Sequence, residues 1–153
     1  MDIIIKDFSA EYVNPVAEIE KICFAHPWSE KSLAEELEND KSHFFVACAG
    51  TDEATVSGYI GMQAIVDGAY ITNVAVLPQY RRHGIGDMLL KKAIACAKAL
   101  NLDFITLEVR PSNTAAVSLY ERNGFITVGR RKSFYRSPVE DGLIMTLQFN
   151  ENE

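Results

Sequence analysis

The sequence predicts an α/β fold of the α+β type, with a mixed sheet that is mostly antiparallel and contains one parallel pair of strands. Three observations lead to this prediction. Short apolar strands alternate with amphipathic helices, Asp67-Gly68 joins two strands as a hairpin, and a helical pattern over 85–100 separates two later strands. A helical crossover joins parallel neighbours through a right-handed connection, so the strands on either side of that helix should be parallel.

Length and composition indicate a single domain. The chain has 153 residues, of which 48% are hydrophobic and 24% charged, as in ordinary soluble globular proteins. We expect one domain over 1–149 and a frayed acidic tail over 150–153. No apolar run is long enough to cross a membrane, and the first residues lack the pattern of a secretory signal, so a cytoplasmic location is expected.

The net charge of −6 and the pI near 5.1 argue against broad nucleic-acid binding, which needs a basic face, and favour a cationic partner such as a basic peptide. Cysteine and histidine usage predicts neither disulfides nor a metal site. The three cysteines have no close-spaced pair and are expected to be buried apolar side chains, and the histidines are scattered. The cysteines are Cys23, Cys48 and Cys96, and the histidines are His26, His43 and His83.

The first third of the chain reads as a strand and two helices. A strand is expected over 2–8, and Ser9 is expected to cap a helix over 10–24. Pro27 ends regular structure in an aromatic loop, and Ser29 caps the second helix. The apolar stripe of the first helix is predicted to contain Val13, Val16, Ile19, Ile22 and Cys23.

The remaining elements follow from apolar patterns and turn residues. Strands are expected over 43–49, 56–66 and 69–76, with turn residues at 50–53, and the helix over 85–100 leads to a strand over 104–110. A short helix then begins at Pro111-Ser112 and closes in a left-handed cap at Asn123-Gly124. An antiparallel pair, 125–129 and 142–149, is predicted around an irregular segment over 130–141.

An anion cradle is predicted where the strand ending at Val76 gives way to the next helix. Gly84 and Gly86 open that helix, whose first backbone N–H groups have no partner within it. Those donors and the positive end of the helix dipole form a phosphate site, and glycine lets a phosphate oxygen approach the backbone. Arg81 and Arg82 add charge-assisted contacts at its rim.

The cradle does not match two common phosphate-binding motifs. No Gly-x-Gly-x-x-Gly follows the strand, and no Gly-Lys-Ser/Thr is present. What remains is Arg81-x-x-Gly84-x-Gly86 after an apolar strand that ends Val-Leu-Pro. The chain also carries Pro27-Trp28-Ser29, Leu107-Glu108-Val109-Arg110, Ser112-Asn113, Leu119-Tyr120-Glu121, Asn123-Gly124-Phe125 and Arg130-Arg-Lys-Ser-Phe-Tyr135.

In this ordered set of motifs the sequence resembles the GNAT N-acetyltransferase superfamily, and within it the RimI-type enzymes, from the first strand to about Phe149. The resemblance implies a three-layer fold with helices on both faces of the sheet and a parallel pair splayed at the cofactor site. It also implies acetyl-coenzyme A as cosubstrate, with the glycine turn on its pyrophosphate. The expected cofactor-binding residues are Val74, Ala75, Val76, Arg81, Arg82, His83, Gly84, Ile85, Gly86, Asp87, Asn113 and Tyr120.

Glu108 is the candidate general base. It lies near the carboxyl end of the strand parallel to the cradle strand, where open α/β sheets bind ligands, and a carboxylate alone or through a water can deprotonate an amine. The resemblance places the base at the same position. The structural alternative for Glu108 is a strand residue that pairs with Arg110 or faces solvent.

Tyr120 is the matching family position for the general acid that protonates the leaving thiolate. Asn113 and Tyr120 are seven residues apart and should share one face of the short helix. The structural alternatives are a core tyrosine and a helix-capping asparagine. On the cradle strand, Val74 to Val76 are expected to leave backbone groups unpaired for the pantetheine arm, and one N–H to polarise the thioester carbonyl.

Substrate selection is assigned to Phe24, Trp28 and Tyr135, although a lone Trp often anchors a loop and the basic run 130–132 is often solvated. The resemblance implies direct attack in a ternary complex, with the N-terminal alanine of a small-subunit ribosomal protein as acceptor. Two alternatives stay open: acetylation of lysine side chains or small amines such as polyamines, and a non-catalytic coenzyme A-binding module.

Overall fold

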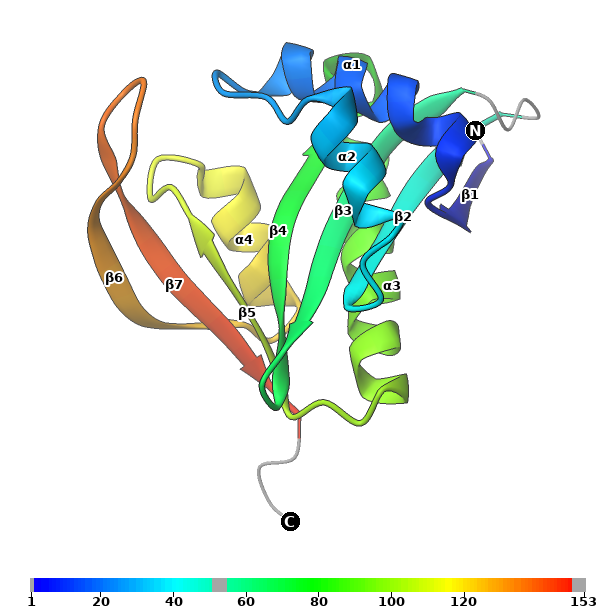
Figure 1. The fold of residues 1–153 in the computed structure, drawn as a ribbon. Helices are drawn as coiled ribbons and strands as arrows, with labels where there is room; N and C mark the ends of the chain where they lie inside the picture. Colours follow the sequence, from blue (N-terminus) through cyan, green and yellow to red (C-terminus); the bar gives the residue numbers. More distant parts are fainter. Residues whose placement is uncertain (1, 51–54, 150–153) are drawn as a thin grey trace.

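The fold is built on one seven-stranded sheet. The computed structural model describes residues 2–50 and 55–149 (Figure 1). The strand order is β1-β2-β3-β4-β5-β7-β6. The strands are β1 Ile3–Asp7, β2 Ser42–Ala49, β3 Val56–Ile65, β4 Gly68–Val76, β5 Phe104–Val109, β6 Ile126–Tyr135 and β7 Glu140–Gln148. The helices are η1 Ala10–Tyr12, α1 Val13–Cys23, α2 Glu30–Glu36, η2 Pro78–Tyr80, α3 Ile85–Ala99 and α4 Thr114–Arg122.

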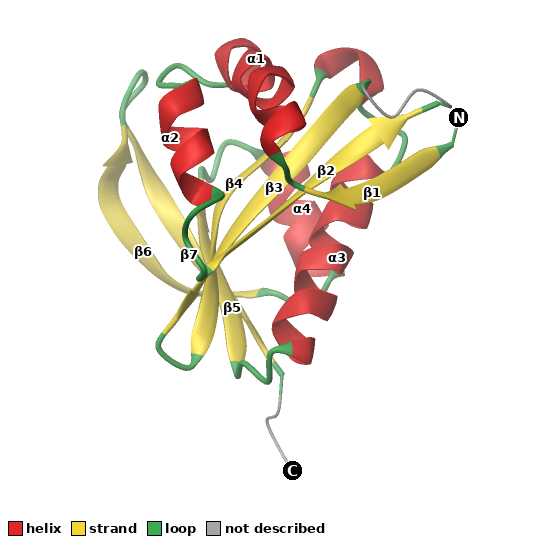
Figure 2. Cartoon of the chain, turned by 45° about the vertical axis from the view of Figure 1, so that its right-hand side comes forward, coloured by secondary structure: helices red, strands yellow, loops and turns green. Residues whose placement is uncertain are grey.

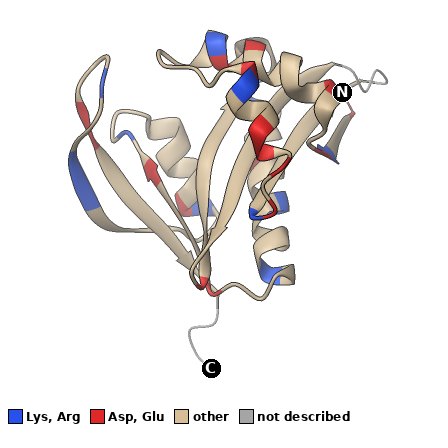
Figure 3. Cartoon of the chain, viewed as in Figure 1, with Lys and Arg blue, Asp and Glu red and all other residues tan. Residues whose placement is uncertain are grey.

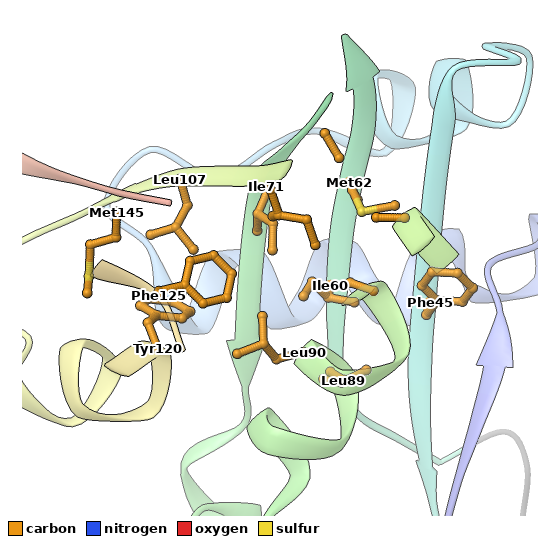
Figure 4. Packing of buried hydrophobic residues seen from close by; sticks show 14 of the residues in the cluster. Phe45, Ile60, Met62, Ile71, Leu89, Leu90, Leu107, Tyr120, Phe125 and Met145 are labelled. Carbon is orange, nitrogen blue, oxygen red and sulfur yellow. The ribbon is translucent and has the colours of Figure 1, made fainter. Parts of the chain in front are cut away.

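Helices cover both faces of the sheet, which confirms the predicted three layers (Figure 2). On one face, α1 and α2 bury Val16, Ile19 and Leu33 against inward side chains of β2 and β3. On the other face, α3 and α4 bury a second cluster, in which Leu89 and Leu90 belong to the same core as Ile60 of β3, Leu107 of β5 and Phe125 (Figure 4). Alternate residues of each strand supply the two cores because successive side chains point to opposite faces.

The parallel pair is joined only at its start. β4 pairs with β5 through Gly68 to Tyr70 opposite Phe104 to Thr106, and no later pair is formed between the two strands. β4 continues to Val76 along β3, while β5 continues to Val109 along β7. The two strands therefore diverge where the sequence predicted a splay, and they open the sheet on the carboxyl side of the pair.

β4 contains a bulge within this splayed part. Asn73 lies opposite Gly61 and Ile71 lies opposite Met62, so Thr72 is an extra residue with no partner on β3. A bulge of this kind changes which face the following side chains point to. Ile71 contributes to the core beneath α3, whereas Ala75 contributes to the core beneath α1. Asn73, two residues before Ala75, shares the α1 face.

The prediction of an irregular segment over 130–141 is wrong. β6 extends to Tyr135 and β7 begins at Glu140, so four residues separate the strands. The pairing tolerates two irregularities and is supported by Asp141, which accepts from the Arg130 guanidinium at 3.0 Å and from the backbone N–H of Ser133 at 2.8 Å. An edge strand that is exposed along most of its length lacks the apolar alternation by which strands are recognised in sequence.

The expected start and stripe of the first helix need correction. Ser9 makes no side-chain cap, and the chain enters α1 through the 3₁₀ turn, in which the N–H of Tyr12 donates to the Ser9 carbonyl at 2.9 Å. Ile22 is 60% exposed rather than part of the buried stripe. Glu20 takes a buried place on that face instead, because positions 13, 16, 17 and 20 follow helical spacing.

Two further expectations, the cap at Ser29 and the left-handed close of α4 at Gly124, are confirmed. Ser29 accepts from the backbone N–H of Ser32 at 3.0 Å, and Gly124 closes α4 with φ 93°. Of the cysteines, only Cys48 is fully buried, which corrects the expectation for Cys23 and Cys96. Within residues 2–50 and 55–149, no helix is both long and apolar enough to span a membrane. The expected turn at 50–53 lies largely outside the described residues, and the expected tail at 150–153 lies wholly outside them.

Candidate active site

A cavity of about 660 Å³ lies where β4 and β5 diverge. It is lined by β4 and β5, by the C-terminal part of α1 and the loop that follows it, by α4, and by the end of β6. Seven of the residues expected from the sequence to bind or react line this one cavity: Phe24, Trp28, Val74, Glu108, Asn113, Tyr120 and Tyr135. Residues as far apart in the sequence as Phe24 and Tyr135 therefore meet at a single site.

Glu108 is held on the cavity wall by two partners. Tyr70 of β4 donates its hydroxyl to Oε1, across the start of the splay, and Arg131 of β6 donates Nε to Oε2 at 2.7 Å. The Glu108 side chain is 6% exposed and that of Arg131 is 57% exposed. Lys and Arg gather on β6 (Figure 3), and here one of them neutralises a buried carboxylate. Arg110, the alternative partner, instead pairs with Glu140 at 3.2 Å.

Tyr120 is a buried residue of α4 whose ring packs against Phe125, with centroids 5.7 Å apart. Burial, and then the neighbouring Tyr135, raise the pKa of Tyr120 above its ordinary value. The phenol therefore stays protonated at neutral pH and keeps a proton to donate. Tyr120 is therefore both a core tyrosine, as in the structural alternative, and a residue that lines the cavity.

Asn113 caps α4. Its Oδ1 accepts from the backbone N–H of Ala116 at 3.1 Å, which is the capping alternative considered from the sequence. The same residue also lines the cavity. Capping occupies Oδ1, and the amide nitrogen is the group left to contact a ligand.

The cavity mouth is framed by the loop after α1 and by the turn between β6 and β7. Arg110 supports that turn by donating to the carbonyls of Pro138 at 2.9 Å and Arg136 at 2.8 Å, and its guanidinium lies 4.5 Å from the ring centroid of Tyr135. His26 Nε2 lies 3.2 Å from Ser137 Oγ and joins the two loops. Trp28 packs against the core, with its ring 6.1 Å from that of Phe44, and so combines an anchoring role with a place in the cavity.

The helix expected after the glycine turn begins at Ile85. Gly84 is the N-cap of α3 with φ 78°, a left-handed conformation, and a Cβ built there would meet nothing within 4 Å. The N–H groups of the first turn have no acceptor within the helix, since the first intrahelical bond runs from Met88 N to Gly84 O. A Cβ on Gly86 would approach Leu119 of α4 at 3.3 Å, so glycine allows α3 and α4 to pack closely.

The side chains around the cradle differ in their surroundings. Arg81 donates Nε to the Val76 carbonyl at 2.9 Å, so that carbonyl is not left unpaired as the sequence suggested. Ile85 is buried, and only its backbone can reach a ligand. Arg82, with φ 69°, and His83 are exposed.

Asp87 ties the first turn of α3 to its surroundings. Its carboxylate accepts from Lys91 Nζ at 2.9 Å and from Asn123 Nδ2 at 2.9 Å. These hydrogen bonds, with that of Asn123 the larger contribution, hold the pKa of Asp87 below its ordinary value. Asn123, the C-cap of α4, thus contacts the cradle, while Tyr120 of α4 lines the cavity, so this helix connects the two parts of the site.

The site also contains residues that the sequence did not single out. Glu20, Tyr70 and Arg131 each contribute a buried or ion-paired polar group, and Glu20 and Asn73 line the cavity. A signal existed for Glu20, since an acidic residue falls on the apolar stripe of α1. Arg131 lies in the motif over 130–135 but received no role of its own from the sequence, and Tyr70 and Asn73 are ordinary strand residues in isolation.

Comparison with known proteins agrees with this geometry. The model of the acetyltransferase (GNAT) family matches residues 13–125. The ribosomal protein bS18-alanine N-acetyltransferase of Escherichia coli is 34% identical over 131 residues, covering 84% of this chain and 86% of the relative. A protein of Bacillus subtilis is provisionally named for the same activity. It is 35% identical over 148 residues, which cover 96% of this chain and 96% of the relative.

Solved structures give the same assignment. The crystal structure of the ribosomal-protein-S18-alanine N-acetyltransferase from Escherichia coli has a TM-score of 0.87 and 30% identity, and covers 99% of both chains. A chain of the NatC complex bound to Gag peptide and CoA has a TM-score of 0.85 and 25% identity, and covers 98% of this chain and 100% of its own. The protein described here belongs to the GNAT acetyltransferase family.

Proposed function

We propose that this enzyme transfers the acetyl group of acetyl-coenzyme A to the N-terminal α-amino group of a protein, the acceptor being the N-terminal alanine of a basic small-subunit ribosomal protein in the cytoplasm. The observation that carries the proposal is the cavity in the splay, where Glu108 and Tyr120 line a space open to the loops Phe24–Trp28 and 136–139. The names of the relatives support the choice of acceptor.

The residues of the chain fit acetyl-coenzyme A. The left-handed Gly84 and the free N–H groups of α3 suit a pyrophosphate. Beyond Tyr70, the edge of β4 that faces β5 has no strand partner among the described residues, and this edge suits the amides of a pantetheine arm. When bound, the cosubstrate supplies an activated thioester carbonyl. In this proposal the phosphates of the cosubstrate are bound and oriented by Arg81, Arg82 and the backbone of 83–87. Val74 to Val76 border its thioester end.

In this proposal Glu108 is the general base that accepts a proton from the acceptor amine. An α-amino group has a reference pKa of about 7.7–8.0, against about 10.4 for lysine, so its neutral form is reached more easily near pH 7. Tyr70 and Arg131 position the Glu108 carboxylate from opposite sides. Tyr120 is the general acid: its protonated phenol donates to the departing sulfur.

The test is a thiol-release assay with acetyl-coenzyme A and a peptide that begins Ala-Arg. Release above the rate without peptide is expected, and no such release would refute the proposal. A Glu108→Gln variant keeps the shape of the side chain but removes the base, so turnover should fall by roughly 10²–10⁴-fold while coenzyme A binding is retained. Full activity of this variant would remove Glu108 from the role of base.

A second peptide separates the acceptor classes. It carries a blocked N-terminus and free lysine side chains, and it should be acetylated far more slowly than the Ala-Arg peptide. Preference for the blocked peptide, or for a polyamine, would assign the enzyme to side-chain or small-amine acetylation. Tight coenzyme A binding with no turnover on any of these amines would indicate a binding module.

A further inference from the structure

Glu20 is a carboxylate buried in the site, with 1% of its surface exposed. Three donors converge on it: the backbone N–H of Trp28 at 2.8 Å on Oε1, and on Oε2 the hydroxyl of Tyr59 and the Nδ2 of Asn73 at 3.2 Å. Burial, and then the Glu20 carboxylate, raise the pKa of Tyr59, so this phenol remains a donor. The carboxylate therefore joins the loop that follows α1 to the splayed strand β4.

The bulge at Thr72 is what brings Asn73 into this network. Without the extra residue, Asn73 would face the same side as Ile71, toward α3. With it, Asn73 faces Glu20 on the α1 side. Glu108 points to that side as well, since its neighbours Leu107 and Val109 belong to the core beneath α3 and α4.

Glu20 also fixes which way the Asn73 amide is turned. If the amide were reversed, its Oδ1 would face a carboxylate oxygen, and two acceptors would meet with no hydrogen between them. With Nδ2 on Glu20, Oδ1 is buried and has no hydrogen-bond partner among the described residues. A buried carbonyl oxygen without a donor is costly, so a donor supplied by a ligand is the expected complement.

The acceptor amine is the donor that suits this oxygen. An amine that attacks a carbonyl carbon keeps a lone pair for attack and has more than one N–H to place. Glu108 takes the proton that must be lost, and a second N–H needs an acceptor on the same side of the sheet. A neutral oxygen meets this need without favouring the charged, non-nucleophilic ammonium, as another carboxylate would.

We propose that Asn73 Oδ1 binds an N–H of the acceptor amine and orients it for attack, and that Glu20 is the positioning residue that keeps this oxygen turned toward the substrate. The inference rests on the proposed function, whose acceptor amine it places. It adds to Glu108 and Tyr120 a specific contact for the nucleophile.

The Glu20→Gln variant tests this orientation. The fixed N–H of Trp28 requires the glutamine oxygen in the Oε1 position, so the new NH₂ group faces both Asn73 and the Tyr59 hydroxyl, which turns to accept from it. Asn73 then gains a hydrogen bond by reversing its amide, because Oδ1 can accept from the glutamine NH₂. The reversed amide presents its own NH₂ group to the substrate instead of an oxygen. The KM for the Ala-Arg peptide should rise roughly tenfold, the effect of about one hydrogen bond, with the KM for acetyl-coenzyme A unchanged.

A double variant gives a rescue. In Glu20→Gln with Asn73→Asp, the glutamine NH₂ donates to one oxygen of Asp, and the other oxygen faces the substrate as an acceptor. The peptide KM should return to within a few-fold of wild type, whereas kcat is not expected to recover, because a carboxylate beside the amine favours its charged form. If Glu20→Gln does not fold, Asn73→Ala removes the same oxygen and should give the same rise in peptide KM.

The matched control is Glu36→Gln. Glu36 likewise accepts from a hydroxyl, that of Ser42, and from an amide, the Nε2 of Gln63 at 2.9 Å, but it does not line the active-site cavity. Both KM values of this variant should match wild type. It therefore reports the general effect of neutralising an amide-bonded carboxylate in this fold.

Two outcomes would overturn the inference while the proposed function stands. One is that Glu20→Gln has the same peptide KM as Glu36→Gln, while Glu108→Gln still shows its large loss of turnover. If Glu20→Gln does not fold, the peptide KM of Asn73→Ala is compared instead. The other is a rise in the KM for acetyl-coenzyme A in place of the peptide, which would assign the oxygen to the cosubstrate. Absence of turnover by the wild-type enzyme on the Ala-Arg peptide would instead refute the proposed function itself.

Discussion

The Gly84→Ala substitution separates backbone strain from loss of the anion site. Gly84 has φ 78° and open space around its missing Cβ. A non-glycine residue in the left-handed region costs roughly 1–2 kcal/mol. For a chain of this size, about 1 kcal/mol lowers the Tm by about 2–4 °C.

Gly50 is the matched control for this strain. It has φ 72° and likewise nothing within 4 Å of a built Cβ, so Gly50→Ala should lower the Tm by a similar amount. Only Gly84→Ala places a methyl group beside the free N–H groups of α3. Hydrogen bonds to charged groups contribute about 1.5–3 kcal/mol each, so loss of one predicts a rise in the KM for acetyl-coenzyme A of at least about tenfold.

The assay combines thermal unfolding with initial rates over a range of acetyl-coenzyme A concentrations. Similar Tm shifts for the two variants, with a raised cosubstrate KM only in Gly84→Ala, would support the cradle. Equal KM values in both variants would show that phosphate does not approach this turn, and the assignment of the α3 N-terminus as the pyrophosphate site would be wrong.

Two further variants probe α4 and its contact with α3. Tyr120→Phe keeps the ring packing but removes the phenol proton, so kcat should fall by roughly 10²-fold with little change in Tm; unchanged kcat would exclude Tyr120 as the acid. Asp87→Asn tests the pH dependence of stability. The pKa of Asp87 is lowered in the folded state, so its stabilisation is fully present above the unfolded-state pKa of about 3.9 and is lost as pH falls through the lower folded value. The variant should therefore be less stable than wild type at pH 7, and the difference in Tm should shrink below about pH 4; a gap that widens in acid would contradict this.

Most of the fold follows from local sequence signals. The hairpin signalled by Asp67-Gly68, the Ser29 cap and the long helix each carry a pattern set by neighbouring residues, and all three are present, although the loop of the hairpin is Val66-Asp67. β6 was only partly recognised because an exposed edge strand needs no apolar alternation. Ile22 was misplaced because a helical stripe drawn from apolar residues alone passes over Glu20.

The active site was predictable in part. Glu108, Asn113 and Tyr120 were expected together and share one cavity. Their partners were not, because each depends on contacts between distant segments: Arg131 is 23 residues from Glu108, and Asn73 is 53 residues from Glu20. The sequence sign nearest the bulge at Thr72 is Gly61 on the facing strand β3, because Thr72 itself is an ordinary strand residue.

The short pairing between β4 and β5 implies that changes which stabilise this part of the sheet would lower activity. Three residue pairs join the strands, and beyond Tyr70 the β4 edge that faces β5 has no strand partner within the described part of the chain. In the proposed function a ligand takes that place. Substitutions that extended the pairing toward Val76 and Val109 would add backbone hydrogen bonds and make the sheet more stable. They would also close the space in which the reaction is proposed to occur, so a stabilised variant of this kind is expected to be an inactive one.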